Sequence, residues 1–275
     1  MIMRELTIRE TQKVSLEILH TIASICEQEG FRYALIYGTL IGAIRHKGYI
    51  PWDDDVDIMM PRPDYELLLS YLKVHIQEYK YLKVFNREEC PEYPYMITRI
   101  SDDRYELQMQ NEKPFGMGVF IDIYPYDGLG NTPKEALKFG LRGDGLSSLC
   151  YQATREHFAI ETTTSLLRKA IKFPVYFISK LVGKDFFQNK LEKLAGIKNY
   201  DENNYVGCVV WLSWGEKDIF ERKWFEETIV VPFEQYSFRV PKYYDEVLRH
   251  EYGDYMKLPP EKDRIGHHFY KVFEK

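Results

Sequence analysis

The chain has 275 residues, 45% of them hydrophobic and 29% charged, which supports a sizeable folded core and excludes a disordered chain. With 37 Lys and Arg against 42 Asp and Glu, its formal net charge is -5, so it lacks the overall basic field of a general nucleic-acid binder, and we expect no nucleic-acid partner. The four cysteines are far apart and form no C-x-x-C pair, which indicates reduced thiols and argues against a zinc cluster. The first ten residues lack the apolar region of a signal peptide, and no run reaches the roughly 18 apolar residues of a membrane span, so we expect a cytoplasmic protein.

The first 131 residues alternate between helical and strand-like patterns. Apolar residues at helical spacing predict a first helix over 14–26, which Gly30 ends. In chain order, the other elements expected here are a strand at 31–37, a helix at 40–46, a strand at 55–60, a helix at 63–74, and strands at 95–101 and 118–124.

From Thr132 onward the pattern changes, because residues 132–195 contain few turn signals and are typical of helices. After them we expect a strand at 206–212, a hairpin of strands 228–231 and 236–240, and a last helix at 243–251 that Gly253 ends. The predicted fold class is α+β, a mixed sheet flanked by helices. Its parts are a core (1–131), a helical insertion (132–200) and a C-terminal segment (201–275) that completes the core.

Four acids occur within five residues, where Asp53 to Asp57 reads Asp-Asp-Asp-Val-Asp. Residues two apart in a strand share a face, so Asp55 and Asp57 are expected side by side, with Val56 toward the core. Two carboxylates about 6–7 Å apart repel unless a cation lies between them, and hard oxygen ligands favour Mg²⁺, with Mn²⁺ as a second option. By the same alternation Asp53 could join this face, so the alternation alone does not decide which two acids form the pair. For Asp53 and Asp54, an acidic surface turn is the alternative.

Upstream, Gly38 and Thr39 lie where the predicted strand runs into the predicted helix, and the free N–H groups at a helix start form an anion site. Thr39 could cap that helix or donate to a phosphate. Three potential cations follow at Arg45, His46 and Lys47. A phosphate-binding turn, basic side chains and an acidic strand together indicate phosphoryl transfer. A solvated helix end is the alternative for the basic residues.

A further acid, Asp122, stands in the middle of the apolar strand at 118–124. A buried carboxylate is costly unless it is paired or metal-bound. Asp122 is therefore the candidate third metal ligand and a candidate to orient or deprotonate an acceptor hydroxyl. A carboxylate satisfied by backbone donors is the alternative.

The segment from Gly38 to Ile58, G-T-L-I-G-A-I-R-H-K-G-Y-I-P-W-D-D-D-V-D-I, resembles the signature of the LicD family of bacterial phosphocholine transferases, to which the fukutin proteins are distantly similar. Two further segments match that family, F-I-D-I-Y-P at 120–125 and Y-G-D-Y-M-K-L-P-P at 252–260, the latter followed by His267. The resemblance spans most of the chain except the helical insertion.

The resemblance implies a nucleotidyltransferase-like fold in which Asp55 and Asp57 are the D-x-D pair, in preference to Asp53, and Asp122 is the third acid. It also implies Mg-dependent transfer of phosphocholine from CDP-choline to a sugar hydroxyl of a cell-surface glycan, such as a teichoic acid or lipopolysaccharide precursor, with release of CMP. The alternatives are another CDP-alcohol as donor, transfer of the nucleotide to a small molecule or protein, and a non-enzymatic nucleotide-binding module.

The tail that shares this resemblance supplies candidates for donor binding. Tyr252 and Tyr255, together with Trp52, are candidates for an aromatic box around a quaternary ammonium group. Arg264 and His267 are candidates to bind phosphate. Plain aromatic packing is the alternative.

Residues 165–190 contain six basic residues and one acid, interleaved with apolar residues. We expect an amphipathic surface segment, broken at Pro174, that docks on an anionic membrane. Such docking would bring the protein to the inner face of the plasma membrane, where a lipid-linked glycan acceptor lies. Core helices with solvated lysines are the alternative.

Overall fold

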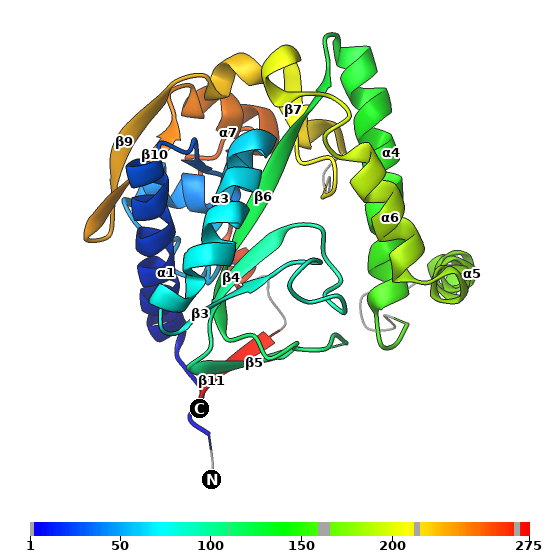
Figure 1. Ribbon diagram of the computed structural model, residues 1–275, viewed down its shortest axis with the longest axis horizontal. Coiled ribbons are helices and arrows are strands. Elements are labelled where there is room, and N and C mark those ends of the chain that lie inside the picture. Colours follow the sequence, from blue (N-terminus) through cyan, green and yellow to red (C-terminus); the bar gives the residue numbers. More distant parts are fainter. Residues whose placement is uncertain (1–2, 110, 159–165, 212–214, 267–269) are drawn as a thin grey trace.

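A mixed sheet runs through the centre of the computed structural model, which describes residues 3–109, 111–158, 166–211, 215–266 and 270–275 (Figure 1). Its strands lie in the order β1-β2-β6-β4-β3, with β2 and β6 parallel and the other neighbours antiparallel. Their bounds are β1 (Ala34–Leu35), β2 (Asp57–Pro61), β3 (Leu82–Phe85), β4 (Thr98–Asp102) and β6 (Val119–Gly130). Helices lie against this sheet, and the predicted α+β class is confirmed.

Strand β6 lies in the middle of the sheet and continues through Pro125, whereas the sequence predicted a strand that ends at residue 124. Proline has no N–H to give to a sheet and is tolerated where a neighbour is missing. Strand β4 pairs with β6 only as far as Ile123, so Pro125 faces a single partner strand, β2. Beyond it, β7 (Tyr205–Gly207) pairs with the end of β6, and β8 (Phe220–Glu221) pairs with β7. The predicted strand at 206–212 is thus short, and Leu212 lies outside the described residues.

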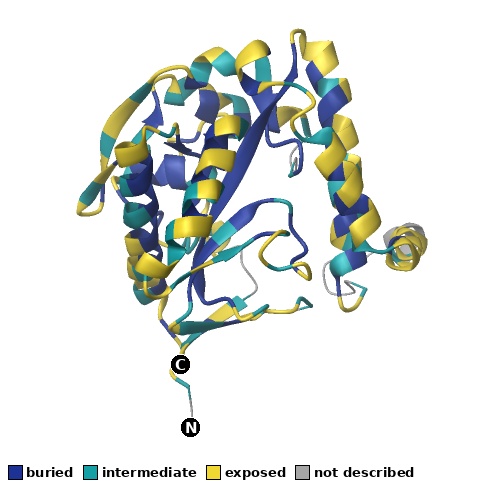
Figure 2. Ribbon diagram, viewed as in Figure 1, coloured by how far each residue is buried: buried dark blue, intermediate teal, exposed yellow. Residues whose placement is uncertain are grey.

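Two long helices pack on the central strands, α1 (Ile8–Glu29) against β6 and β4 and α3 (Arg62–His75) against β2 and β6 (Figure 1). A capping box between Thr7 and Glu10 begins α1, and Gly30 ends it with a φ of 75°, as its position predicted. The apolar stripe of α1 is buried (Figure 2), which accounts for the helical spacing in the sequence.

Between α1 and β2 the chain forms less strand than its apolar run suggests. Only Ala34–Leu35 pairs with β2, because the helix α2 (Tyr37–Ile41) already begins at Tyr37. A π-helical turn, Gly42–His46, follows directly. π-Helical turns are rare and are often found at functional sites.

Among the described residues between 133 and 194, three helices lie to one side of the sheet, α4 (Pro133–Thr154), α5 (Leu166–Val182) and α6 (Lys184–Leu194) (Figure 1). The expected break at Pro174 is wrong, because α5 runs through it. Proline removes one helical hydrogen bond, and both Ala170 and Pro174 are exposed, so water can satisfy the carbonyl that is left free. The division of the chain into three parts stays a prediction.

The remaining elements close the molecule. The predicted hairpin is confirmed as β9 (Thr228–Phe233) and β10 (Tyr236–Pro241), and the last helix as α7 (Tyr244–Tyr252), which Gly253 ends. A separate pair joins β5 (Tyr105–Met109) to the last strand, β11 (Tyr270–Glu274). Short 3-10 turns are Ile76–Glu78, Tyr200–Glu202, Gly215–Asp218, Arg222–Phe225 and Glu261–Asp263.

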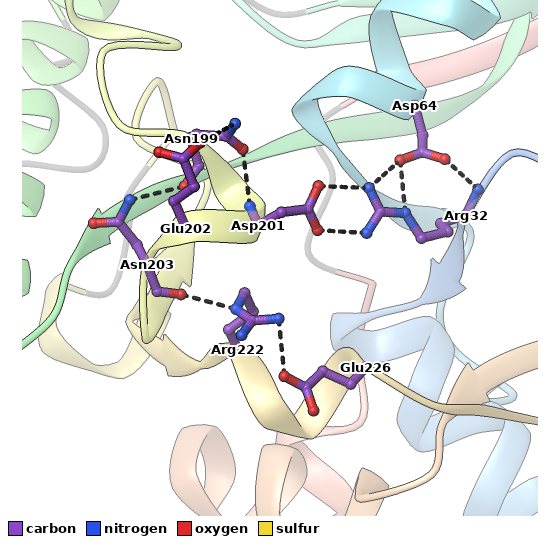
Figure 3. A network of polar contacts seen from close by, with 8 residues as sticks. All are labelled: Arg32, Asp64, Asn199, Asp201, Glu202, Asn203, Arg222 and Glu226. Carbon is purple, nitrogen blue, oxygen red and sulfur yellow. Dashed lines mark hydrogen bonds and ion pairs between the residues drawn. The ribbon is translucent and has the colours of Figure 1, made fainter.

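Ion pairs tie the N-terminal part of the fold to residues beyond 200 (Figure 3). Arg32 donates to both oxygens of Asp201, at 2.6 and 3.0 Å, and through its Nε to Asp64 of α3 at 2.8 Å. The chain after the helices is thereby held against the start of α3 and the segment before β1.

Candidate functional site

A cavity of about 630 Å³ lies where α2, the start of β2 and the chain after α7 meet. It brings together segments separated by some two hundred residues, as the resemblance implied for the tail. Its lining residues are Tyr37, Gly38, Ile41, Arg45, Ile50, Trp52, Asp53, Asp55, Asp57, Tyr124, Trp211, Glu251, Tyr252, Asp254, Tyr255, Lys257, Leu258, Pro259 and Pro260. A larger hollow of about 830 Å³ between α3 and β3 shares none of these residues and lacks the acidic strand.

Asp57, the first residue of β2, is one of the buried acids of this cavity. Its side chain is buried, and its Oδ1 atom has no hydrogen-bond partner among the described residues. Burial raises its pKa well above the ordinary value, and repulsion from Asp55, Asp122, Asp53 and Glu251 adds to the rise. A positive charge at this position would relieve both effects.

Asp55 lies in the segment before β2, so the prediction that Asp55 and Asp57 share one face of a strand is wrong. The chain turns at Ile50 to Asp53, where the Asp53 N–H donates to the Ile50 carbonyl, and pairing with β6 starts only when the Val56 carbonyl accepts from the Asp122 N–H at 2.8 Å. The side chains of Asp53, Asp55 and Asp57 nevertheless line the same cavity.

Asp122 stands opposite Asp57 in the parallel β2–β6 register and opposite Arg99 in the antiparallel β4–β6 register. Arg99 donates from Nε to Asp122 Oδ1 at 2.7 Å and from Nη2 to Oδ2 at 3.4 Å. The Arg99 guanidinium also lies 4.8 Å from the ring centre of Tyr95 and 4.1 Å from that of Phe120. The buried charge of Asp122 is therefore balanced by a side chain that the sequence analysis missed, since only sheet register pairs the two.

The turn at Gly38 and Thr39 begins α2, and Gly38 borders the cavity. A Cβ atom on Gly38 would come within 2.8 Å of Asp53 Oδ2, so only glycine lets that carboxylate approach. Thr39 does not cap the helix, because Ile36 holds the N-cap position. Its Oγ1 instead accepts from the Asp57 N–H at 2.9 Å, which fixes the turn to the acidic strand. Tyr37, with a φ of 53°, carries the backbone strain of this turn.

The three basic residues after the turn have different surroundings. Arg45 lines the cavity and donates to the Tyr255 carbonyl at 2.5 Å, so it also holds the tail in place. His46 accepts from Arg45 Nε at 3.0 Å, and burial and the charge of Arg45 lower its pKa. Lys47 is exposed and is not among the cavity's lining residues, and its carbonyl accepts from the Glu234 N–H of the hairpin turn.

Of the tail residues, Tyr252 and Tyr255 line the cavity. Arg264 lies behind Trp52, with its guanidinium 5.7 Å from the ring centre, and its Nε donates to the Pro259 carbonyl at 3.0 Å. His267, the other candidate phosphate ligand, lies outside the described residues.

The acidic side chains suit a hard divalent cation, although the residues that the structure describes hold no group of three or more His, Cys, Asp or Glu side chains arranged around a common metal position. Mg²⁺ is commonly bound by one or two carboxylates, with substrate phosphates and water as the other ligands. Asp55 and the unpartnered Oδ1 of Asp57 supply such a set. The residues present therefore fit a Mg²⁺ ion that arrives with a phosphate group.

The sequence analysis also missed Glu251, Tyr37, Tyr124 and Trp211 as parts of this cavity. In the sequence, all four lie within predicted strands or a predicted helix, which accounted for them without a site. The burial of Glu251 is visible only in the structure, so its position along the chain carried no signal of a site.

Comparison with known proteins finds similarity along the whole chain. The family model described as "LicD/FKTN/FKRP, nucleotidyltransferase domain" matches residues 30–140. Lipopolysaccharide cholinephosphotransferase LicD of Haemophilus influenzae is 32% identical over 275 residues, which cover 98% of this chain and 99% of that protein. An uncharacterized protein of Rickettsia typhi is 26% identical over 147 residues, 46% of this chain and 47% of that protein. The family match contains the glycine turn, Asp53, Asp55, Asp57 and Asp122.

Proposed function

Since the chain belongs to the LicD family and is a phosphotransferase, we propose that it transfers phosphocholine from CDP-choline to a sugar hydroxyl of a cell-surface glycan, with release of CMP. The observation that carries this proposal is the cavity itself, which is lined both by carboxylates suited to a metal-bound pyrophosphate and by aromatic side chains suited to a quaternary ammonium group. The name of the Haemophilus influenzae relative, a lipopolysaccharide cholinephosphotransferase, supports a glycan acceptor. A lipopolysaccharide or teichoic acid precursor would provide the hydroxyl.

We propose that Asp55 and Asp57 hold Mg²⁺, which Mn²⁺ could replace, and that Asp122 completes the acidic centre. When bound, the ion would neutralise charge on the donor pyrophosphate. Asp122 would keep the acidic centre in position through its bonds to Arg99 and orient the attacking hydroxyl. Arg45 borders the same cavity and would attract the donor phosphates, while its bond to the Tyr255 carbonyl keeps the tail closed over them. Positioning and electrostatics would supply most of the rate.

The decisive experiment follows the donor by ³¹P NMR in the presence of a lipid-linked oligosaccharide acceptor. Release of CMP shows that phosphocholine was transferred, whereas release of phosphocholine shows that the nucleotide was transferred. We expect CMP, at a rate that falls to background with EDTA and returns with Mg²⁺ or Mn²⁺. Activity that is indifferent to EDTA would refute the metal proposal. A panel of CDP-alcohols in the same assay separates choline from glycerol and ribitol donors.

We further propose that α5 docks this enzyme on the anionic membrane surface where a lipid-linked acceptor lies. Figures 1 and 2 show α5 at the outer side of the helical region with an exposed surface. Its exposed apolar side chains, 41% to 72% accessible, are Phe173, Val175, Phe177, Ile178, Leu181 and Val182. Lys172 and Lys180 are exposed beside them, and this combination matches the acyl and anionic layers of a membrane interface. None of the described helices is long and apolar enough to cross a bilayer.

Flotation with phosphatidylglycerol-containing and pure phosphatidylcholine vesicles tests this docking. We expect the wild type to float only with anionic vesicles, and the double variant F177E/L181E to stay at the bottom of the gradient. Val74 of α3, which is 72% exposed, provides the matched control V74E. If the double variant floats like the wild type, or if it only abolishes self-association in solution, the membrane role of α5 is refuted.

A further inference from the structure

A buried carboxyl group, that of Glu251, borders the same cavity. Glu251, near the end of α7, is 1% exposed, and its Oε2 atom has no hydrogen-bond partner among the described residues. Buried polar atoms are almost always satisfied, and an exception requires an explanation. Because Glu251 lines the cavity, its carboxyl lies close enough to act electrostatically on a ligand there.

The surroundings of Glu251 leave its negative charge poorly compensated. Burial raises its pKa from 4.5 to about 8, and repulsion from the buried Asp218 adds to the rise. A hydrogen bond with the Tyr252 side chain and the attraction of Lys217 only partly oppose this. A cation in the cavity would supply the stabilisation that the fold itself does not.

Aromatic side chains line the same cavity. Tyr37, Tyr124, Trp211 and Tyr252 line it with Glu251, and the rings of Tyr37 and Tyr124 meet edge to face at 5.1 Å. Aromatic faces attract cations, most strongly when the cation is weakly hydrated. A quaternary ammonium group cannot donate hydrogen bonds and loses little on leaving water, so it fits rings and a bare carboxylate.

The surroundings of Trp52 and Tyr255 suit a different chemical group. Trp52 and Tyr255, which the sequence analysis placed in an aromatic box, lie next to positive charge. The guanidinium of Arg264 lies against the Trp52 ring, and Arg45 binds the Tyr255 carbonyl. A bound ammonium group would be repelled there, whereas phosphate would be attracted.

We propose that Glu251, with the rings of Tyr37, Trp211 and Tyr252, forms the subsite for the quaternary ammonium group of the donor. Glu251 is then the residue that makes the enzyme prefer a cationic alcohol over a neutral one. This inference rests on the proposed function, because it assumes that the cavity binds a CDP-alcohol. It assigns the phosphates to the surroundings of Arg45 and the alcohol to those of Glu251.

The test compares two donors that differ in one atom, which is a positively charged nitrogen in one and a neutral carbon in the other. CDP-choline and its neutral isostere, CDP-3,3-dimethylbutanol, have the same shape, and calorimetry gives the dissociation constant of each in the presence of Mg²⁺. We expect the wild type to bind CDP-choline at least about tenfold more tightly, which corresponds to about 1.4 kcal/mol. In Glu251→Gln this preference should fall below about twofold, through weaker binding of CDP-choline alone. Glu251→Asp keeps the charge and should keep part of the preference.

Glu246→Gln is the matched control, since Glu246 lies on the same helix but is exposed. It should behave like the wild type. The subsite is refuted if E251Q retains the tenfold preference for CDP-choline. It is also refuted if the wild type binds both donors equally, an outcome that can be observed even if E251Q does not fold. The proposed function fails separately, when the wild type shows the binding preference but releases no CMP with any glycan acceptor.

Discussion

Replacing Glu251 with Gln should change how the stability of the whole protein depends on pH. The pKa of the Glu251 carboxyl is raised from 4.5 to about 8 in the folded protein, chiefly by burial. Between these values the folded state keeps a proton that the unfolded state has released. The free energy of unfolding therefore decreases as pH rises through this window. Below about pH 4.5 the carboxyl is protonated in both states, so it adds nothing to the pH dependence of stability.

The size of the effect follows from the same two values. A single proton difference changes the free energy of unfolding by about 1.4 kcal/mol per pH unit, so Glu251 accounts for a loss of about 4 kcal/mol between pH 5 and pH 8. E251Q has no titrating group there and should lose that part of the slope. At pH 8 it should be more stable than the wild type, by an amount on the order of 3–4 kcal/mol.

Urea unfolding followed by tryptophan fluorescence at pH 5, 6, 7 and 8 measures this difference. The comparison with the wild type removes the contributions of titrating groups remote from Glu251, because both proteins contain them. Asp57 is not one of these, since repulsion from Glu251 contributes to its raised pKa. Glu246→Gln, on the exposed face of the same helix, should reproduce the wild-type slope. Parallel curves for E251Q and the wild type would show that Glu251 is charged and solvated in the folded protein, and would refute the electrostatic argument.

Three further substitutions test the acidic centre and the fold around it. Asp57→Asn should lower transfer activity at least about 100-fold, because it removes a proposed metal ligand. It should not lower the free energy of unfolding, because it removes a buried carboxylate with an unpartnered oxygen, and a destabilised D57N would contradict this. Arg99→Met leaves Asp122 buried and unpaired and should cost about 3–5 kcal/mol in urea unfolding, whereas a loss under about 1 kcal/mol would mean that the pair is solvated. Arg32→Ala removes the half-exposed bonds to Asp201 and should cost only about 1 kcal/mol in the same measurement, so a larger loss would show that this network is a main support of the fold.

Much of the fold followed from local patterns. The capping box at Thr7, the stop at Gly30 and the hairpin after Thr228 are set by neighbours in the chain, so their spacing predicted them. The strand through Pro125 was not predictable in this way. Whether proline is tolerated there depends on which strands flank it, and the sheet order decides that.

The acidic segment shows the same division. Its residue types predicted a site for phosphate chemistry, and its resemblance to one family predicted the partner segments of the tail. The position of Asp55 ahead of β2 depended on a turn that no periodicity signals, so the expected strand face was wrong. The pairing of Arg99 with Asp122 depended on strand register, which a sequence without its sheet order does not specify.

The sequence by itself determined the chemical inventory: an acidic cluster, a glycine turn, basic residues behind it and an aromatic tail, in an α+β chain. Only the tertiary structure decided which of these meet. It joined the tail to the acidic strand, paired Arg99 with Asp122, and placed Glu251 as a buried carboxyl in a cavity that aromatic rings also line. The physical reason is that charge and burial act through space, so residues remote in sequence share one low-dielectric cavity, and their order along the chain does not record that proximity.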